Sequence, residues 1–171
     1  MLGLFILTLP VWLAAADLPE IKNMQAVNDH IYRGAQPSSE GFKQLAKMGI
    51  KTVIDLRDKA AQADREKQIV ESLGMKYVGV PMSMHSPTDD QIAKALSVLN
   101  SVESAPVFLH CLGGRDRTGV VIACYRITHD GWDNRKALAE ATVHGLSVFD
   151  VGMRHYIVRF HPKSNSGGAS K

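Results

Sequence analysis

A short apolar run, a glycine-containing loop and a longer apolar run follow one another in the second half of the chain. Residues 106–109 are apolar and rich in β-formers, whereas residues 120–125 continue far enough past Gly119 to form a buried helix. This order predicts a strand, a loop and a helix N-terminus. The first turn of such a helix presents unpaired N–H groups and the positive end of the helix dipole. The stretch therefore predicts a site for an oxyanion.

The residues of this loop suit a phosphate group. Gly113 and Gly114 permit positive φ and a close approach of the backbone, and Arg117 offers a planar pair of donors to two phosphate oxygens. The expected phosphate-binding residues are Leu112, Gly113, Gly114, Arg115, Asp116 and Arg117.

Cys111 stands between the predicted strand and the loop. A helix N-terminus and an arginine beside a thiol favour the thiolate, which is the nucleophilic form. Attack on a phosphate monoester would give a cysteinyl-phosphate that water then hydrolyses. Thr118 could donate its hydroxyl to the sulfur and assist its departure. Cys124, in contrast, lies among apolar residues at helical spacing and is expected to be a buried, inert thiol.

This stretch resembles the signature of the cysteine-based protein phosphatases. A histidine, His110, precedes Cys111, five residues separate Cys111 from Arg117, and Thr-Gly follows. Two other segments resemble the atypical dual-specificity phosphatases of bacteria and their plant and fungal relatives, namely residues 31–37 and 49–57. The resemblance extends over about residues 28–160. It implies that Cys111 attacks, that Arg117 holds the phosphoryl oxygens and that His110 holds the loop and tunes the thiolate.

The resemblance also implies an aspartic acid, from a loop before the phosphate site, that protonates the leaving oxygen. Asp89 is the first candidate and Asp90 the second, while Asp116 inside the loop is a third. Thr88 and Gln91 point to a different role, because they form a capping box that would place both aspartates of the pair in the first turn of a helix. The sequence leaves the choice of acid open.

Helical and strand patterns alternate along the chain. Strands are expected at residues 31–33, 51–56 and 75–80, with helices from residue 38 or 39 to Gly49, over 59–73, from Thr88, from Asp133 and around 149–160. The alternation predicts an α/β fold of the dual-specificity phosphatase type, with a central, mostly parallel sheet flanked by helices. Cys111 would lie at the carboxyl end of a strand, where such folds bind ligands.

Three charged or aromatic positions carry weaker expectations. Arg33 is expected in solvent, with a second phosphate group as the alternative partner. The charges of residues 59–73 are expected on a solvated helix face. Phe149 is expected to pack in the core as part of the last helix.

The two ends of the chain differ from its middle. Residues 1–16 carry no charged side chain and end in three alanines, as a cleaved signal peptide does, and their apolar run is shorter than the roughly 17–25 residues that span a bilayer. We therefore expect a signal peptide over 1–16, a phosphatase domain over 17–163, a disordered polar tail over 164–171, and a periplasmic or secreted protein with no membrane span in the mature chain.

Composition and motifs restrict the partners. The net charge of +3 comes without a dense basic run, which argues against nucleic-acid binding. The metal-binding spacings His-Glu-x-x-His and Cys-x-x-Cys do not occur, so neither a metal nor a cofactor is expected. The oligomeric state is left open.

The expected function is hydrolysis of protein phosphotyrosine, extending to phosphoserine and phosphothreonine, with a phosphoprotein or a small phosphorylated molecule as partner. Three alternatives remain. Arg115 adds positive charge that suits inositol phosphates or phosphoinositides. Loss of the general acid would leave an inactive phosphate-binding module. A sulfur-transfer enzyme of the rhodanese type fits the Arg-Thr-Gly ending less well.

Overall fold

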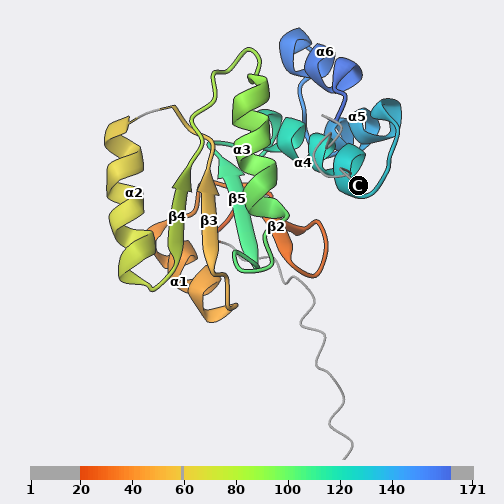
Figure 1. Cartoon of the computed structure of the whole chain (residues 1–171). Coiled ribbons are helices and arrows are strands. Elements are labelled where there is room, and N and C mark those ends of the chain that lie inside the picture. Colours follow the sequence, from red (N-terminus) through yellow and green to blue (C-terminus); the bar gives the residue numbers. More distant parts are fainter. Residues whose placement is uncertain (1–19, 59, 163–171) are drawn as a thin grey trace, which may run out of the picture.

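The computed structural model describes residues 20–58 and 60–162. A five-stranded sheet lies at its centre, with helices on both faces (Figure 1). The expected signal peptide, residues 1–16, and the expected polar tail, residues 164–171, lie outside the described residues. No helix of the described part of the chain is both long and apolar enough to cross a bilayer.

The sheet is mostly parallel, as the alternation of elements predicts. Its strands are β1 (Gln25–Ala26), β2 (Ile31–Ala35), β3 (Thr52–Asp55), β4 (Lys76–Gly79) and β5 (Val107–Cys111). They lie in the order β1-β2-β5-β3-β4, and β1, which the sequence patterns did not indicate, forms the antiparallel pair with β2. The register pairs Cys111 with Ala35 and His110 with Asp55. The carboxyl ends of β2, β3 and β5 therefore meet at one edge.

Six helices flank the sheet in the described part of the chain. They are α1 (Ser39–Lys47), α2 (Ala60–Ser72), α3 (Asp89–Leu99), α4 (Asp116–His129), α5 (Asn134–Val143) and α6 (Val151–Arg159). α1 and α5 start where the sequence indicates, because the Ser38 side chain accepts from the N–H of Gly41 and the Asp133 side chain accepts from that of Lys136. Thr88 and Gln91 form the expected reciprocal capping box at the start of α3.

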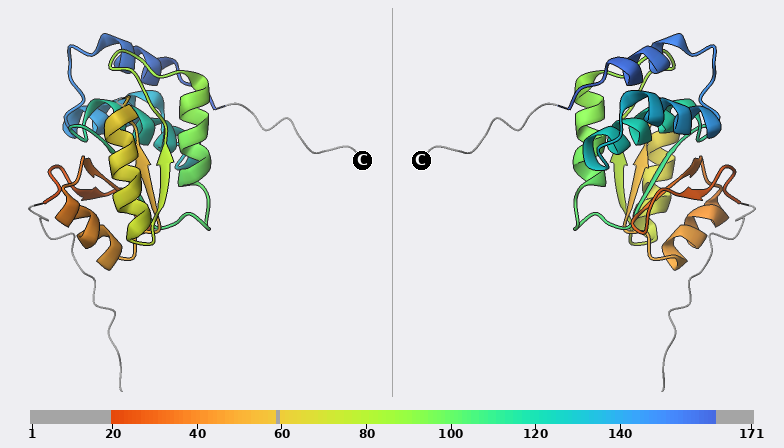
Figure 2. Two further views of the ribbon diagram at one scale, coloured as in Figure 1. Left: turned by 90° about the vertical axis from the view of Figure 1, so that its left-hand side faces the viewer. Right: turned by 90° about the vertical axis from the view of Figure 1, so that its right-hand side faces the viewer.

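Two apolar clusters hold the layers together. Phe42 and Leu45 of α1 and Val70 of α2 pack with Val53 and Phe108 on one face of the sheet. The larger cluster on the other face joins β3 and β5 to α3, α4, α5 and α6. Both side views show α6 close to the loop that joins β4 to α3 (Figure 2).

The last helix is shorter than the sequence pattern indicates. Phe149 precedes α6 and is 90% exposed, so the expectation of a core position is wrong. Met153 and Ile157 are buried instead. In the sequence, Phe149 stands at helical spacing from Met153. The helix nevertheless begins only after Asp150, because the Asp150 side chain caps it by accepting a hydrogen bond from the N–H of Met153.

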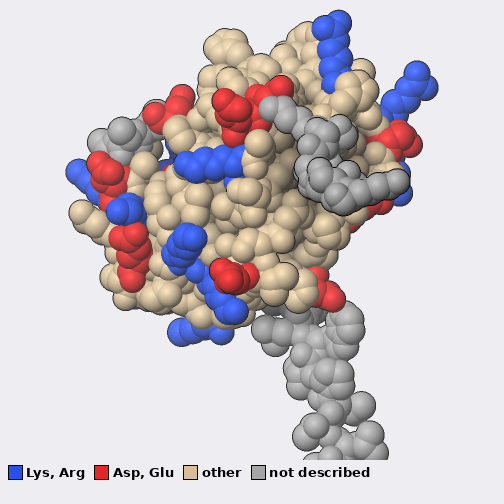
Figure 3. All heavy atoms as spheres, viewed as in Figure 1, with Lys and Arg blue, Asp and Glu red and all other residues tan. Residues whose placement is uncertain are grey.

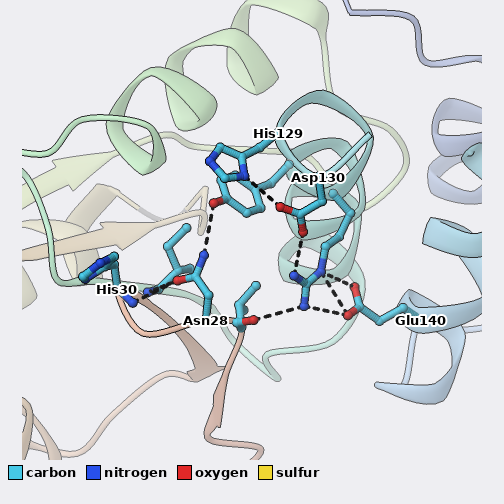
Figure 4. A network of polar contacts seen from close by, with 9 residues as sticks. Asn28, His30, His129, Asp130 and Glu140 are labelled. Atoms are coloured by element: carbon cyan, nitrogen blue, oxygen red, sulfur yellow. Dashed lines mark hydrogen bonds and ion pairs between the residues drawn. The ribbon is translucent and has the colours of Figure 1, made fainter. Parts of the chain in front are cut away.

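A polar network fastens the turn between β1 and β2 to the helices (Figure 4). The Arg126 guanidinium of α4 contacts Glu140 of α5 at 2.9 Å and Asp130 at 2.7 Å, and it also donates to the carbonyl of Val27. The Asn28 amide donates to the Tyr125 hydroxyl at 3.1 Å. The turn that leads into β2 is thus fixed against α4. On the molecular face drawn in Figure 3, basic and acidic side chains are interspersed.

Candidate active site

The loop between β5 and α4 is pressed against β2. Cys111 ends β5 and is 3% exposed, and α4 begins at Asp116. Gly114 has φ +67°, and a Cβ at this residue would lie 2.3 Å from the carbonyl carbon of Gly34. Only glycine can occupy this position, because any side chain would collide with backbone.

Groups outside the loop bind its carbonyl oxygens. The Asn23 amide donates to the carbonyl of Gly113 at 2.8 Å, and the Gln36 N–H donates to that of Leu112 at 3.2 Å. Arg33 donates from Nη2 to the carbonyl of Gly114 at 3.0 Å. Within the described residues, the N–H groups of residues 113–116 have no such partner. The carbonyls are thus fixed, while the N–H groups remain available to an anion.

Arg33 lies underneath this loop, and the expectation that its side chain is solvated is wrong. Its side chain is 2% exposed, and Nη1 has no hydrogen-bond partner within the described part of the chain. Burial lowers the pKa of Arg33, against the opposing influence of Glu140 and Cys111. The parallel pairing of β2 with β5 causes this placement, since it carries the Arg33 side chain beside the loop that follows β5.

A buried network of charged residues lies around His110, the residue that precedes Cys111. His110 is fully buried, and its Nδ1 lies 3.2 Å from the carbonyl oxygen of Cys111 while Nε2 lies 2.8 Å from Glu66. Glu66 also pairs with the Arg57 guanidinium, which in turn pairs with Asp55 at 2.6 Å. The sequence placed the charges of α2 on a solvated face, and for Glu66 this is wrong, because buried His110 and Arg57 need an acceptor there.

The Asp55 carboxylate of this network keeps its charge despite burial. Burial raises the pKa of Asp55, but the hydrogen bonds and the charge of Arg57, together with nearby His110, outweigh it and hold this pKa below its ordinary value. For Tyr77, whose hydroxyl donates to Asp55 at 2.9 Å, burial and the adjacent carboxylate raise the pKa. Asp55, Glu66 and His110 offer three possible metal-ligand atoms within 4.8 Å of one another. The Arg57 guanidinium already supplies the positive charge that this cluster requires.

Arg117 meets two loops at the same edge of the sheet. It is 4% exposed, and its Nη1 donates to the carbonyl of Met82 at 3.3 Å. Nη1 also lies 3.6 Å from the carboxylate of Asp58, whose side chain is 52% exposed. Asp58 is not among the residues expected from the sequence. The usable signal was its position just beyond β3, because loops after neighbouring parallel strands share one edge.

The three acids predicted from the sequence have other surroundings in the structure. Asp89 begins α3 and accepts from the Tyr156 hydroxyl at 2.8 Å, in the wall of a cavity of about 700 Å³ between α3 and α6. Asp90 is exposed. Asp116 accepts from the N–H of Ser147 at 2.8 Å and so fastens α4 to the loop between α5 and α6. Asp58 is therefore the carboxylate that approaches Arg117.

The remaining predicted residues surround the loop. The Thr118 hydroxyl is buried, and no hydrogen-bond partner for it exists among the described residues, so it is available to the Cys111 sulfur. Arg115 is exposed, and its aliphatic stem lies against Gly145. Leu112 is 60% exposed at the rim. Cys124 is buried as expected, and burial raises the pKa of its thiol.

The fold and the loop together define a class. A cysteine that ends a strand of a mostly parallel sheet, followed by a glycine loop and by an arginine in the first turn of a helix, characterises the cysteine-dependent phosphatases. This chain belongs to the family described as DSP-PTPase phosphatase fused to NAD+ kinase, whose sequence model matches residues 11–152.

Individual proteins agree with this assignment. The dual specificity protein phosphatase TpbA of Pseudomonas aeruginosa is 30% identical over 132 residues, which cover 77% of this chain and 57% of that protein. The inositol diphosphatase DSP5 of Arabidopsis thaliana is 30% identical over 108 residues, which cover 61% of this chain and 53% of that protein. The chain thus spans about half the length of these relatives.

A solved structure confirms the fold. The catalytic domain of the PP-IP phosphatase SIW14 from S. cerevisiae superposes with a TM-score of 0.71 at 23% identity, covering 82% of this chain and 86% of that chain.

Proposed function

We propose that this protein is a cysteine-dependent phosphomonoesterase that hydrolyses protein phosphotyrosine, with phosphoserine and phosphothreonine as further substrates. One observation carries the proposal. The loop places Cys111 and Arg117 around backbone N–H groups that have no partner within the described residues, which is an arrangement for binding and attacking a phosphoryl group. The likeness to a dual specificity protein phosphatase supports the choice of substrate.

The reaction proceeds in two displacements. The Cys111 thiolate attacks phosphorus, so that an S–P bond forms as the ester P–O bond breaks and the leaving oxygen takes a proton from an acid. Arg117 and the loop N–H groups hold the three remaining phosphoryl oxygens throughout. Water then attacks phosphorus and gives a proton to the conjugate base of that acid, while the S–P bond breaks and the Thr118 hydroxyl donates a hydrogen bond to the departing sulfur. Phosphate and the free thiolate are the products.

The acid of the first displacement must lie near the phosphate-binding arginine. Asp58 meets this requirement in the structure, at 3.6 Å from Arg117, and its exposure allows it to face a bound ester. Asp89 instead shares a hydrogen bond with Tyr156. We therefore place Asp58 ahead of Asp89 in this role, although the sequence favoured Asp89.

Hydrolysis of p-nitrophenyl phosphate and of a phosphotyrosine peptide tests the proposal. Cys111→Ser should abolish turnover of both, because a hydroxyl is far less nucleophilic than a thiolate at neutral pH. Cys124→Ser is the matched control and should retain activity, since Cys124 is buried in the core away from the loop. Turnover of either ester by Cys111→Ser would contradict the mechanism.

A second candidate substrate is an inositol phosphate or phosphoinositide. Arg115 is exposed beside the loop and could pair with a second phosphate group, and several relatives are named inositol diphosphatases. Equal concentrations of an inositol polyphosphate and a phosphotyrosine peptide separate the two proposals, because the preferred substrate suppresses turnover of the other. Phosphate binding without turnover of any ester would instead indicate the inactive binding module.

We also propose export of the protein, on the basis of residues 1–16 alone. Expression of the full chain in bacteria, followed by mass measurement of the periplasmic protein, tests this. A product that begins near Asp17 supports export, and an uncleaved cytoplasmic product contradicts it.

A further inference from the structure

A groove of about 510 Å³ adjoins the phosphate loop. It lies between the loop that joins β4 to α3 and the loop that joins α5 to α6, and Asp116, inside the phosphate loop, forms part of its wall. The other residues that matter for its chemistry are Met84, His85, Phe149, Asp150 and Val151. Asp116, which directly precedes Arg117, thus connects the groove to the site at which a phosphorylated residue would bind.

Apolar side chains gather around this part of the molecule. Within the described residues, eight large apolar side chains are exposed, and five of them belong to the loops around the phosphate site or to the first turn of α6: Met84, Leu112, Val148, Phe149 and Val151. Exposed apolar side chains that cluster in this way mark interaction surfaces. Phe149, at 90% exposure, is the largest of them.

The segment that carries Phe149 is held in place. The N–H of Phe149 donates to the Ser147 hydroxyl at 3.2 Å, and the Phe149 carbonyl accepts from the N–H of Val151 at 3.0 Å. Asp116 fixes Ser147 from the phosphate loop. Gly152 brings the opposite wall close, since a Cβ there would lie 2.2 Å from the carbonyl oxygen of His85. An aromatic ring on a fixed turn binds a partner with little loss of conformational entropy.

The charges of the groove decide what can occupy it. Asp116 and Asp150 contribute carboxylates to its wall, and His85 is the basic residue that lines it. A second phosphate group or an acidic side chain would be repelled there. Apolar side chains of a polypeptide meet no such repulsion and can bury area against Met84, Phe149 and Val151.

We propose that this groove binds the segment of a phosphoprotein next to the phosphorylated residue, with Phe149 and Met84 selecting apolar side chains over acidic ones. The proposal rests on the proposed function, because it takes a phosphotyrosine in the loop as the anchor. It assigns to the groove the selection among phosphoproteins and leaves the chemistry of the loop unchanged.

Two phosphotyrosine peptides test this proposal, one with leucine and phenylalanine beside the phosphotyrosine and one with glutamates at the same positions. The unaltered protein should show a higher kcat/KM for the apolar peptide. Phe149→Ala and Met84→Ala should each lower kcat/KM for that peptide by about five- to tenfold, mainly through KM. Turnover of p-nitrophenyl phosphate should stay within about twofold, because this small ester does not reach the groove.

Val143→Ala is the matched control, since Val143 is 82% exposed on α5 and does not line the groove. This variant should leave kcat/KM for both peptides unchanged. Equal kcat/KM for the two peptides, or an unchanged preference in Phe149→Ala, would overturn the proposal while protein phosphatase activity stands. If p-nitrophenyl phosphate is hydrolysed but neither peptide is, the proposed function fails and this inference fails with it.

Discussion

The guanidinium of Arg33 donates to the carbonyl of Gly114 at 3.0 Å, so that a buried cation supports the phosphate loop from below. Replacing it with methionine keeps much of the volume but leaves this carbonyl without its donor. We expect Arg33→Met to lower kcat/KM for p-nitrophenyl phosphate by about ten- to a hundredfold, given the 1–3 kcal/mol cost of an unpaired buried acceptor. Arg135→Met, at an exposed position on α5, should have no effect. Unchanged kinetics in a folded Arg33→Met protein would show that the loop holds its shape alone.

Gly114→Ala should abolish activity. The new Cβ would lie 2.3–2.5 Å from backbone atoms of Gly34 and Ala35, so the loop or β2 must move. Gly131→Ala is the control, because Gly131 also has positive φ, +68°, but a Cβ there meets nothing within 4 Å. It should cost about 1 kcal/mol of stability from backbone strain and leave kcat unchanged. Measuring kcat and the urea midpoint of both variants separates the effect of backbone strain, which both variants share, from that of the collision with β2, which only Gly114→Ala has.

Glu66→Ala should destabilise the fold. It removes a buried partner of both Arg57 and His110, and breaking such a buried ion pair costs about 3–5 kcal/mol. Glu71→Ala on the same helix removes an exposed pair with Lys67 and should cost less than about 0.5 kcal/mol. Urea unfolding at neutral pH measures both. Similar losses in the two variants would mean that the buried network contributes little to stability.

Stability should fall in acid as Asp55 takes up a proton. The pKa of Asp55 lies below its ordinary value in the folded state, so its stabilising contribution is fully present above the unfolded pKa of about 3.9. That contribution is lost as pH falls through the lower folded value. Urea midpoints between pH 3 and 7 should therefore drop at the acid end. Asp55→Asn should be less stable at neutral pH and should show a shallower acid decline.

Asp58, Asp89 and Asp116 can be ranked as candidate acids by the pH profiles of their variants. Asp58→Asn should lower kcat for the phosphotyrosine peptide by about 10²–10⁴ and remove the basic limb of its pH–rate profile, because the proton donor is lost. Asp89→Asn should weaken only the bond to Tyr156, and Asp116→Asn only the bond to Ser147. Loss of the basic limb in Asp89→Asn alone would restore the expectation from the sequence.

The sequence by itself determined the local features of this protein. Gly113, Gly114 and Arg117 indicated the phosphate loop, since conformational freedom and a fixed donor pair are properties of the residues themselves. The caps at Thr88 and Asp133 depend on contacts within one turn and agree with the helix starts predicted there, and Ser38 is one of the two residues predicted to start the first helix. The alternation of helices and strands was sufficient for the mostly parallel sheet, because parallel strands need crossover connections.

Only the tertiary structure decided which distant residues support the loop. Arg33, Glu66 and Asp58 are polar residues of ordinary appearance in the sequence, and two of them were expected in solvent. Parallel pairing of β2 and β3 with β5 brings Arg33 and Asp58 to the edge where Cys111 lies, and the packing of α2 places Glu66 against His110. The exposure of Phe149 likewise depends on where α6 begins. Burial of a charge depends on partners far away in the chain, and no local pattern records them.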